Sequence, residues 1–327
     1  MNDHRIRLLC SDKSHLPLHY TLRDSQIPEK YGFRYEVDAV GVSRDGKPPR
    51  TIPERAPLLL AGEYEFLSGL HHQPYIARLK GDKRFVYLAQ TQNYWDDRLL
   101  ARPGIETLKQ LEGKKVLTCN VPCISGNLIK AIAQAGIDVE NINFVFMEGL
   151  QGELNPANVE RVVSGDVDAV TVDIPFDLRA QRQGMNVIPL PDVPVVHNTT
   201  ICTNMEFVSK NEDLVVRFLK ALIEGIHFFK TKPQEVCEIL ERELVSVLGL
   251  KGEREIEHLQ QEWSKLLCSK PYPHPMAVWN VYELDLVKDP RMSSVDPLEV
   301  WDTHYLRQID DSGFIDSLYP QGSLSAK

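Results

Sequence analysis

Short apolar runs recur along the first 200 positions, separated by segments whose apolar residues repeat every three or four positions. The short runs predict β-strands, and the longer repeats predict α-helices. Strands are predicted at 6–10, 33–40, 64–68, 85–90, 115–119, 142–147, 167–172, 186–189 and 199–203. Helices are predicted at 54–61, 72–80, 105–111, 125–135, 156–164 and 176–183. Strands and helices that alternate in this way indicate an α/β protein with parallel sheets.

The C-terminal third is predicted to be almost entirely helical. Apolar residues recur at helical spacing from Leu214 to Ile226, and a second helix is expected at 233–247. Helices without strands cannot complete a sheet, so we expect them to pack back onto the first βα unit. The predicted organisation is residues 1–94 as the first part of lobe 1, 95–197 as lobe 2, and 198–327 as the mostly helical second part of lobe 1.

The chain thus crosses from one lobe to the other near 94–102 and returns near 190–203. The fold class predicted from this pattern is two doubly wound α/β lobes joined by two hinge crossings. In open sheets of this kind, ligands bind beyond the carboxyl ends of the strands. We therefore expect the functional site in a cleft between the lobes.

Several segments carry a resemblance to a known family. They are residues 58–69, 78–81, 99–116 (LLARPGIETLKQLEGKKV), 165–175 (GDVDAVTVDIP) and 204–229. These resemble the type II periplasmic binding protein fold, in the branch shared by sulfonate/nitrate-type solute-binding proteins and thiamine-pyrimidine synthases. The resemblance covers roughly residues 5–240. It does not extend to the synthase activity, because the Cys-rich run of those enzymes is replaced by PVVHN at 194–198.

Composition and charge narrow the function further. The 46 acidic residues outnumber the 37 Lys and Arg residues, which gives a formal net charge of −9 and argues against nucleic acid as a partner. No apolar run approaches the length of about 18 residues that a membrane helix needs. The six scattered cysteines suggest reduced thiols. The N-terminal residues lack an apolar leader, so we predict a cytoplasmic protein, or a periplasmic one only if a leader was removed.

Polar and aromatic residues follow the predicted strands of lobe 1, where this architecture places ligand contacts. The candidate ligand-binding residues there are Asp12, Ser14, His15, His71, His72, Gln92, Asn93 and Trp95. For Asp12, Ser14 and His15 the alternative is an ordinary solvated turn between a strand and a helix. For Trp95 the alternative is that the ring only fills space at the hinge. A metal site is not expected, because no HExxH, CxxC or facial-triad spacing occurs.

Lobe 2 supplies the second set of candidates. Ser125, Gly126 and Asn127 lie where a strand leads into a helix, so free backbone N–H groups there would receive an anion. The alternative for Ser125 is an ordinary helix N-cap. Asp173 follows another predicted strand. Its carboxylate is expected to hydrogen-bond an amine of the ligand or to act as a base, and the alternative is an N-cap of the next helix. His197 lies at the return crossing.

Two functions follow from these candidates. The first is a solute-binding protein of the ABC-transporter type that closes on a small anionic or aromatic ligand, without a cofactor and with a transporter permease as partner if exported. The second is a cytoplasmic, cofactor-independent enzyme on the same scaffold, such as an aromatic-acid decarboxylase or other lyase, with His71, His72 and Asp173 as catalytic candidates. A ligand sensor that regulates a partner is a third class, but no interaction surface for it is visible in the sequence.

Overall fold

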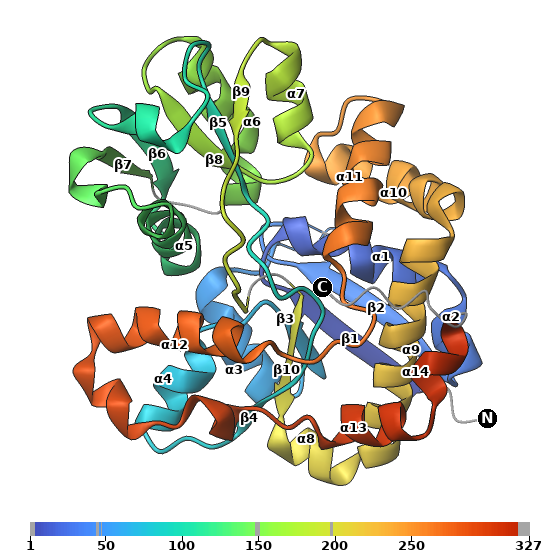
Figure 1. Cartoon of the computed structure of the whole chain (residues 1–327). Helices are drawn as coiled ribbons and strands as arrows, with labels where there is room; N and C mark the ends of the chain where they lie inside the picture. Colours follow the sequence, from blue (N-terminus) through green and yellow to red (C-terminus); the bar gives the residue numbers. More distant parts are fainter. Residues whose placement is uncertain (1–3, 44–45, 47, 148–150, 197–198, 320–327) are drawn as a thin grey trace.

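The computed structural model describes residues 4–43, 46, 48–147, 151–196 and 199–319, which form two lobes, each built around one sheet (Figure 1). The first sheet has the strand order β2-β1-β3-β10-β4 and the second the order β7-β6-β8-β5-β9. The first sheet contains β1 (His4–Cys10), β2 (Phe33–Ala39), β3 (Phe66–Ser68), β4 (Phe85–Gln90) and β10 (Thr200–Asn204). The second contains β5 (Arg98–Ala101), β6 (Lys115–Cys119), β7 (Asn143–Met147), β8 (Ala169–Val172) and β9 (Asn186–Ile188).

Both sheets are mixed, so the prediction of purely parallel sheets was wrong. In the first sheet β10 runs antiparallel to β3 and β4, and in the second β5 runs antiparallel to β8 and β9. Each of these strands directly follows a crossing from the other lobe. A chain that arrives without a crossover helix enters the sheet at its carboxyl edge, and so it runs against its neighbours. Strand β5 itself was not predicted.

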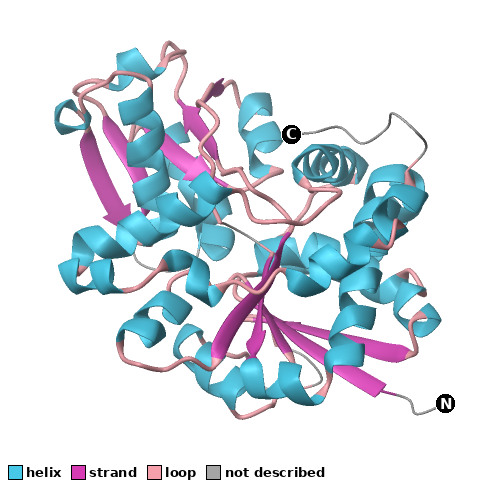
Figure 2. Ribbon diagram, turned by 60° about the horizontal axis from the view of Figure 1, so that its bottom comes forward, coloured by secondary structure: helices cyan, strands magenta, loops and turns pink. Residues whose placement is uncertain are grey.

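Helices surround both sheets, as the ribbon view in Figure 2 shows. The helices along the first 231 residues of lobe 1 are α1 (Leu16–Asp24), α2 (Ile27–Lys30), α3 (Arg55–Leu60), α4 (Gln73–Leu79), α8 (Met205–Lys210) and α9 (Glu212–Thr231). Lobe 2 has α5 (Pro122–Gln134), α6 (Gln151–Val163) and α7 (Phe176–Arg182). The C-terminal helices are α10 (Pro233–Leu248), α11 (Glu253–Leu266), α12 (Pro275–Lys288), α13 (His304–Asp311) and α14 (Phe314–Leu318).

Short 3₁₀ turns complete the chain. They are η1 (Lys13–His15), η2 (Ile52–Glu54), η3 (Leu108–Leu111), η4 (Val139–Asn141), η5 (Pro290–Ser294) and η6 (Pro297–Val300). The helix predicted at 105–111 is therefore reduced to η3. Within the described ranges, no helix combines the length and the unbroken apolar character needed to cross a bilayer.

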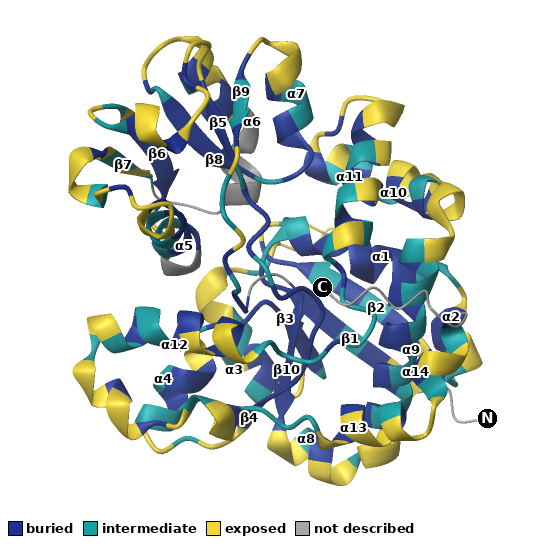
Figure 3. Cartoon of the chain, viewed as in Figure 1, coloured by how far each residue is buried: buried dark blue, intermediate teal, exposed yellow. Residues whose placement is uncertain are grey.

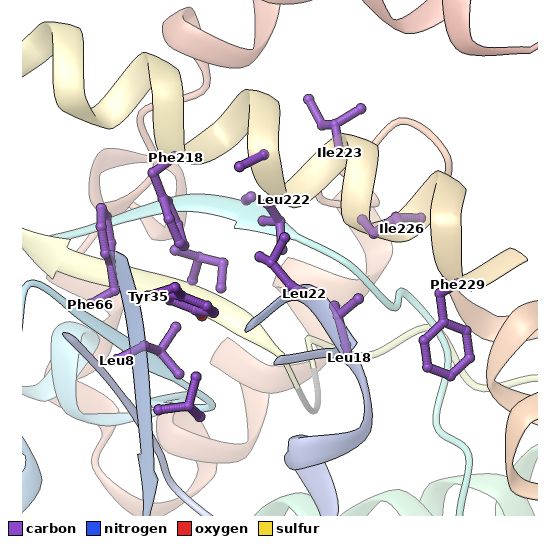
Figure 4. Close-up of a cluster of buried hydrophobic side chains, with 14 of the residues drawn as sticks. Leu8, Leu18, Leu22, Tyr35, Phe66, Phe218, Leu222, Ile223, Ile226 and Phe229 are labelled. Carbon is purple, nitrogen blue, oxygen red and sulfur yellow. The ribbon is translucent and has the colours of Figure 1, made fainter. Parts of the chain in front are cut away.

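The core of lobe 1 lies between its sheet and α9 (Figure 4). The rings of Phe218 on α9 and Phe66 on β3 are stacked with their centroids 4.0 Å apart. Tyr35 on β2 packs against the same Phe218 ring at 5.9 Å. The helical apolar repeat predicted from Leu214 onward thus forms one buried face of α9, and Figure 3 shows the buried interior under an exposed outer surface.

Two segments connect the lobes and lie side by side. Segment 91–97 leads from β4 to β5, and segment 189–196 leaves β9 toward β10. The Trp95 N–H donates to Val193 O at 3.0 Å, and the Val195 N–H donates to Asn93 O at 2.9 Å. Because the connection is one hydrogen-bonded pair of extended segments, small dihedral changes there can rotate one lobe against the other.

His19 on α1 allows a test of the packing behind the first sheet. This imidazole is fully buried, accepts or donates a 3.0 Å hydrogen bond with the Tyr35 hydroxyl, and has its pKa lowered to about 3, chiefly by burial and further by His15. The unfolded chain binds a proton near pH 6.5 and the folded chain does not. The stabilising effect of the neutral ring is therefore complete above pH 6.5 and is lost as the pH falls toward 3.

We expect the free energy of unfolding to fall by roughly 2 kcal/mol between pH 7 and pH 5 from His19 alone, since one pKa unit corresponds to about 1.4 kcal/mol. The variant His19→Asn removes this titration. Urea unfolding at several pH values should give a shallower pH dependence for the variant than for the wild type. Equal slopes for the two proteins would contradict the buried, neutral state of His19.

Candidate functional site

Polar groups form a continuous row along the carboxyl edge of the first sheet. The Ser11 N–H, just after β1, donates to Ser68 O at the end of β3 at 2.8 Å. The Gly69 N–H donates to Thr200 O at 3.0 Å, and the Thr200 hydroxyl donates to Gln90 Oε1 at 2.5 Å. We call the residues Ser11, Ser68, Gly69, Thr200, Gln90 and Gln92 the lobe 1 edge.

His15 lies against this edge because Gly69 has no side chain. A Cβ on Gly69 would lie 2.1 Å from Cε1 and 2.7 Å from Nδ1 of His15, and the backbone of Gly69 has a φ of +88°. The imidazole Nδ1 lies 3.3 Å from Ser68 O, so this nitrogen carries the hydrogen. The ring is buried, with 4% of its surface exposed. The missing Cβ of Gly69 therefore leaves the space that the His15 ring occupies at the strand ends.

Three side chains of the lobe 1 edge have polar atoms that are buried without a hydrogen-bond partner among the described residues. They are the hydroxyls of Ser11 and Ser68 and both amide atoms of Gln92. Exposure is 4% for Ser11, 0% for Ser68 and 1% for Gln92. Gln92 was predicted from the sequence as a ligand contact, whereas neither serine was. Their one signal was their place at the ends of predicted strands, which is also where many ordinary serines lie.

Ser14 and Asp173, predicted from opposite lobes, line one small cavity. Ser14 and Pro17 come from η1 and α1, Asp173 and Ile174 come from the segment that joins β8 to α7, and Phe176 is the first residue of α7. The cavity is completed by two apolar residues of the C-terminal helices, Leu248 and Leu259. The N-cap position of α7 is Pro175, and the backbone carbonyl of Asp173 accepts a hydrogen bond from the Phe176 N–H at 3.0 Å.

The predicted helix start at Ser125 was wrong by one turn. Helix α5 begins at Pro122, with Val121 as its N-cap, and the Ser125 hydroxyl donates back to Val121 O at 3.1 Å. Gly126 lies against α12, where a Cβ would come within 2.6 Å of Leu284 Cδ2. Asn127 is buried, with 1% exposed. Ser125 is therefore neither an N-cap nor at the end of the helix, and Gly126 permits the close approach of α5 to α12.

The two adjacent histidines occupy different environments. His72 Nδ1 lies 2.9 Å from Asp285 Oδ2 on α12, and this contact joins the start of α4 to the C-terminal region. His71 is buried, and its carbonyl oxygen accepts a 2.8 Å hydrogen bond from the Tyr87 hydroxyl. The His72–Asp285 pair spans 213 positions, so sequence spacing gives no indication of it. It gives His72 a packing role beside its predicted ligand-binding role.

Two of the remaining candidates, Asp12 and Asn93, form hydrogen bonds with backbone groups. Asp12 caps η1 by accepting the Ser14 N–H at 2.8 Å, which is the turn interpretation of this residue. Asn93 binds the segment before α12, donating to Tyr272 O at 2.8 Å and accepting from the His274 N–H at 2.9 Å. Trp95 is buried in the crossing, with 8% exposed. His197 lies outside the described residues, so its predicted role stays a prediction.

Comparison with known proteins shows which of them are similar to this chain in sequence and in fold. A model of the family described as "NMT1/THI5 like" matches residues 84–236. The periplasmic sulfonate-binding protein SsuA from Methylobacillus flagellatus KT is 13% identical, with a TM-score of 0.70, and the match covers 100% of this chain and 98% of that one. The periplasmic nitrate-binding protein NrtA from Synechocystis PCC 6803 is 12% identical, with a TM-score of 0.67 and coverage of 98% and 92%.

The chain has the fold of the type II periplasmic binding proteins. The resemblance predicted from the sequence is thereby confirmed, together with the two-lobed α/β fold class. The desulfurization enzyme DSZB shares this fold, with 14% identity, a TM-score of 0.62, and coverage of 94% of this chain and 99% of that one. No match was found among curated proteins. SsuA and NrtA are both named as periplasmic proteins. The comparison therefore gives no support to the predicted cytoplasmic location.

The periplasmic-binding-protein fold is bridged here by the C-terminal helices. Helix α11 contacts α7 of lobe 2 through Arg179–Glu255 at 2.7 Å and His258–Asp177 at 2.9 Å. On the other side, Lys130 of α5 pairs with Glu283 of α12 at 2.7 Å. Any rotation of lobe 2 about the crossing segments must change these contacts.

Four of the described cysteines have thiols that favour the protonated form. Burial, with Asp12 and Asp38, raises the pKa of the Cys10 thiol well above its usual value, and burial likewise raises the pKa of Cys202. The pKa values of Cys237 and Cys268 are also raised, chiefly by burial. A thiol must be deprotonated to act as a nucleophile. Within the described residues, no group of three or more His, Cys, Asp or Glu side chains is placed to hold a metal ion.

Proposed function

We propose that this chain is a solute-binding protein of the ABC-import type that closes on a small anionic or aromatic ligand between its two lobes. The observation that carries the proposal is the pairing of a two-segment hinge with a point where the lobes meet, at which Ser14 and Asp173 line one cavity of about 10 Å³ that widens only if the lobes move apart. A ligand that contacts both lobes favours the arrangement in which they meet. The proposal places the protein in the periplasm, where it would deliver its ligand to a permease.

The named ligands of the fold relatives also support this ligand class. SsuA is named for sulfonate and NrtA for nitrate, and both are small oxyanions. The enzyme DSZB shows that the same fold also supports chemistry, so binding and turnover must be distinguished by experiment. The raised pKa values of Cys10, Cys202, Cys237 and Cys268 disfavour these four thiols as nucleophiles.

The test combines thermal stability with the mass of the recovered ligand. Purified protein is incubated with alkane and benzene sulfonates, aromatic carboxylates, nitrate and pyrimidines. A ligand that binds the native state raises the melting temperature by mass action, and we expect such a rise with ligand recovered unchanged. A rise followed by conversion of the compound would instead establish the enzyme alternative. No rise with any compound would contradict the proposed function.

A further inference from the structure

We infer that the lobe 1 edge binds the headgroup of the ligand, and that it recognises an acceptor-rich monoanion through uncharged donors. This inference rests on the proposed function and deepens it, because it assigns the residues and the headgroup. The evidence is the set of buried polar side chains at this edge, Ser11, Ser68 and Gln92, which have no partner among the described residues.

Ser11, Ser68 and Gln92 lie on neighbouring segments that are joined by hydrogen bonds of the backbone and of Thr200 and Gln90. Ser11 bonds Ser68 through the backbone, and the neighbouring Gly69 bonds Thr200. The Thr200 hydroxyl donates to the Gln90 side chain, whose amide nitrogen donates in turn to Gln92 O. The unpartnered groups therefore belong to one row at the strand ends, on the side of the sheet edge where ligands bind in open α/β folds.

Polar groups in this state are costly to the folded protein. A buried donor without a partner costs about 1–3 kcal/mol, and most buried polar groups in native proteins are hydrogen-bonded for that reason. At the opposite end of β10 the buried Thr203 hydroxyl is satisfied, since it donates to Glu65 O at 2.6 Å. Three unsatisfied side chains in one row are explained if a ligand supplies the missing partners.

The residue types favour an acceptor-rich headgroup. Two hydroxyls and an amide NH₂ can all donate, whereas Gln92 Oε1 is the one unpartnered atom of these side chains that can only accept. The lobe 1 edge contains no Lys or Arg, and Asp12 directly follows Ser11. Without a positive side chain in the row, a dianion gains less than it loses by desolvation, whereas a sulfonate or carboxylate has a single charge to accommodate. Hydrogen bonds to such a charged group are stronger than neutral ones.

The test uses the variants Ser11→Ala and Ser68→Ala, each of which removes one hydroxyl. If the hydroxyls are unpartnered in the free protein, removing either one leaves the melting temperature of the free protein unchanged or raises it. The same variants should bind benzenesulfonate at least tenfold more weakly, measured by calorimetry. The matched control is Thr203→Val, on the opposite end of β10, which should lower the melting temperature and leave the affinity unchanged.

Headgroup choice is tested with compounds that share one phenyl ring. We expect benzenesulfonate and benzoate to bind more tightly than phenyl phosphate, benzamide or benzylammonium. Tighter binding of benzylammonium or phenyl phosphate would overturn the inference, and so would full affinity in both serine variants. Either result would leave the proposed function standing. A lowered melting temperature in both free variants would also overturn it, because it would show that the hydroxyls are already hydrogen-bonded.

Discussion

Gly69→Ala is expected to lower the free energy of unfolding by roughly 2–5 kcal/mol. Two effects add at this position. A φ of +88° is strained for any residue with a Cβ, at about 1–2 kcal/mol. The new methyl group would also lie 2.1 Å from the His15 ring, and overpacking of a buried site costs about 1–3 kcal/mol more. His15 must leave its place beside Ser68, so ligand binding should weaken as well. Urea unfolding and calorimetry measure the two effects.

Gly81→Ala is the matched control for this variant. Gly81 has a φ of +80°, but a Cβ there would meet no atom within 4 Å. It should therefore show the backbone strain alone, about 1–2 kcal/mol, with ligand affinity unchanged. Equal losses in the two variants would contradict the assigned contact between Gly69 and His15.

Glu255→Gln is expected to lower the free energy of unfolding by about 3–5 kcal/mol, because it leaves a largely buried guanidinium without its counter-charge. Glu255 is 1% exposed and accepts both Arg179 Nη2 at 2.7 Å and Arg179 Nε at 3.1 Å. It also accepts the Lys251 N–H at 2.6 Å. Since Arg179 belongs to α7 of lobe 2 and Glu255 to α11, the variant should also loosen the contact between the lobes.

A solvent-exposed ion pair provides the comparison. On α8, Lys210 Nζ lies 2.6 Å from Glu206 Oε1, and both side chains are 68% exposed. Glu206→Gln should change the free energy of unfolding by less than about 1 kcal/mol, as is usual for surface pairs. Urea unfolding of Glu255→Gln and Glu206→Gln measures the loss of unfolding free energy in each variant. A loss below 1 kcal/mol in Glu255→Gln would show that Arg179 finds other partners and that the α7–α11 contact is not a significant constraint.

Local patterns predicted most of the fold. The strands 85–90 and 115–119 coincide with β4 and β6, because both are mainly apolar runs that begin or end at a polar residue. The first turn of α5 was missed although Pro122 stands at its first position, where proline is favoured. The antiparallel direction of β5 and β10 depends on which lobe the chain has just left. No local periodicity contains that information.

The candidate site was predictable in position more than in detail. Strand ends indicated Ser14, Asp173 and Gln92, since ligand contacts of open α/β folds occur there. What the sequence could not supply was the state of each side chain. Asn93 is taken up by backbone groups around Tyr272, and His72 by Asp285, through contacts across about 180 and 213 positions. Ser11 and Ser68 stand out because their hydroxyls have no hydrogen-bond partner among the described residues, and only the three-dimensional structure shows this.

The central claim is that a ligand brings the two lobes together about the paired segments 91–97 and 189–196. Small-angle X-ray scattering measures this directly, as the radius of gyration of the whole chain with and without a saturating ligand from the stability screen. We expect a smaller radius with ligand, and a larger radius in ligand-free Glu255→Gln than in ligand-free wild type. Superimposable scattering curves for the free and ligand-saturated wild-type protein would contradict the claim.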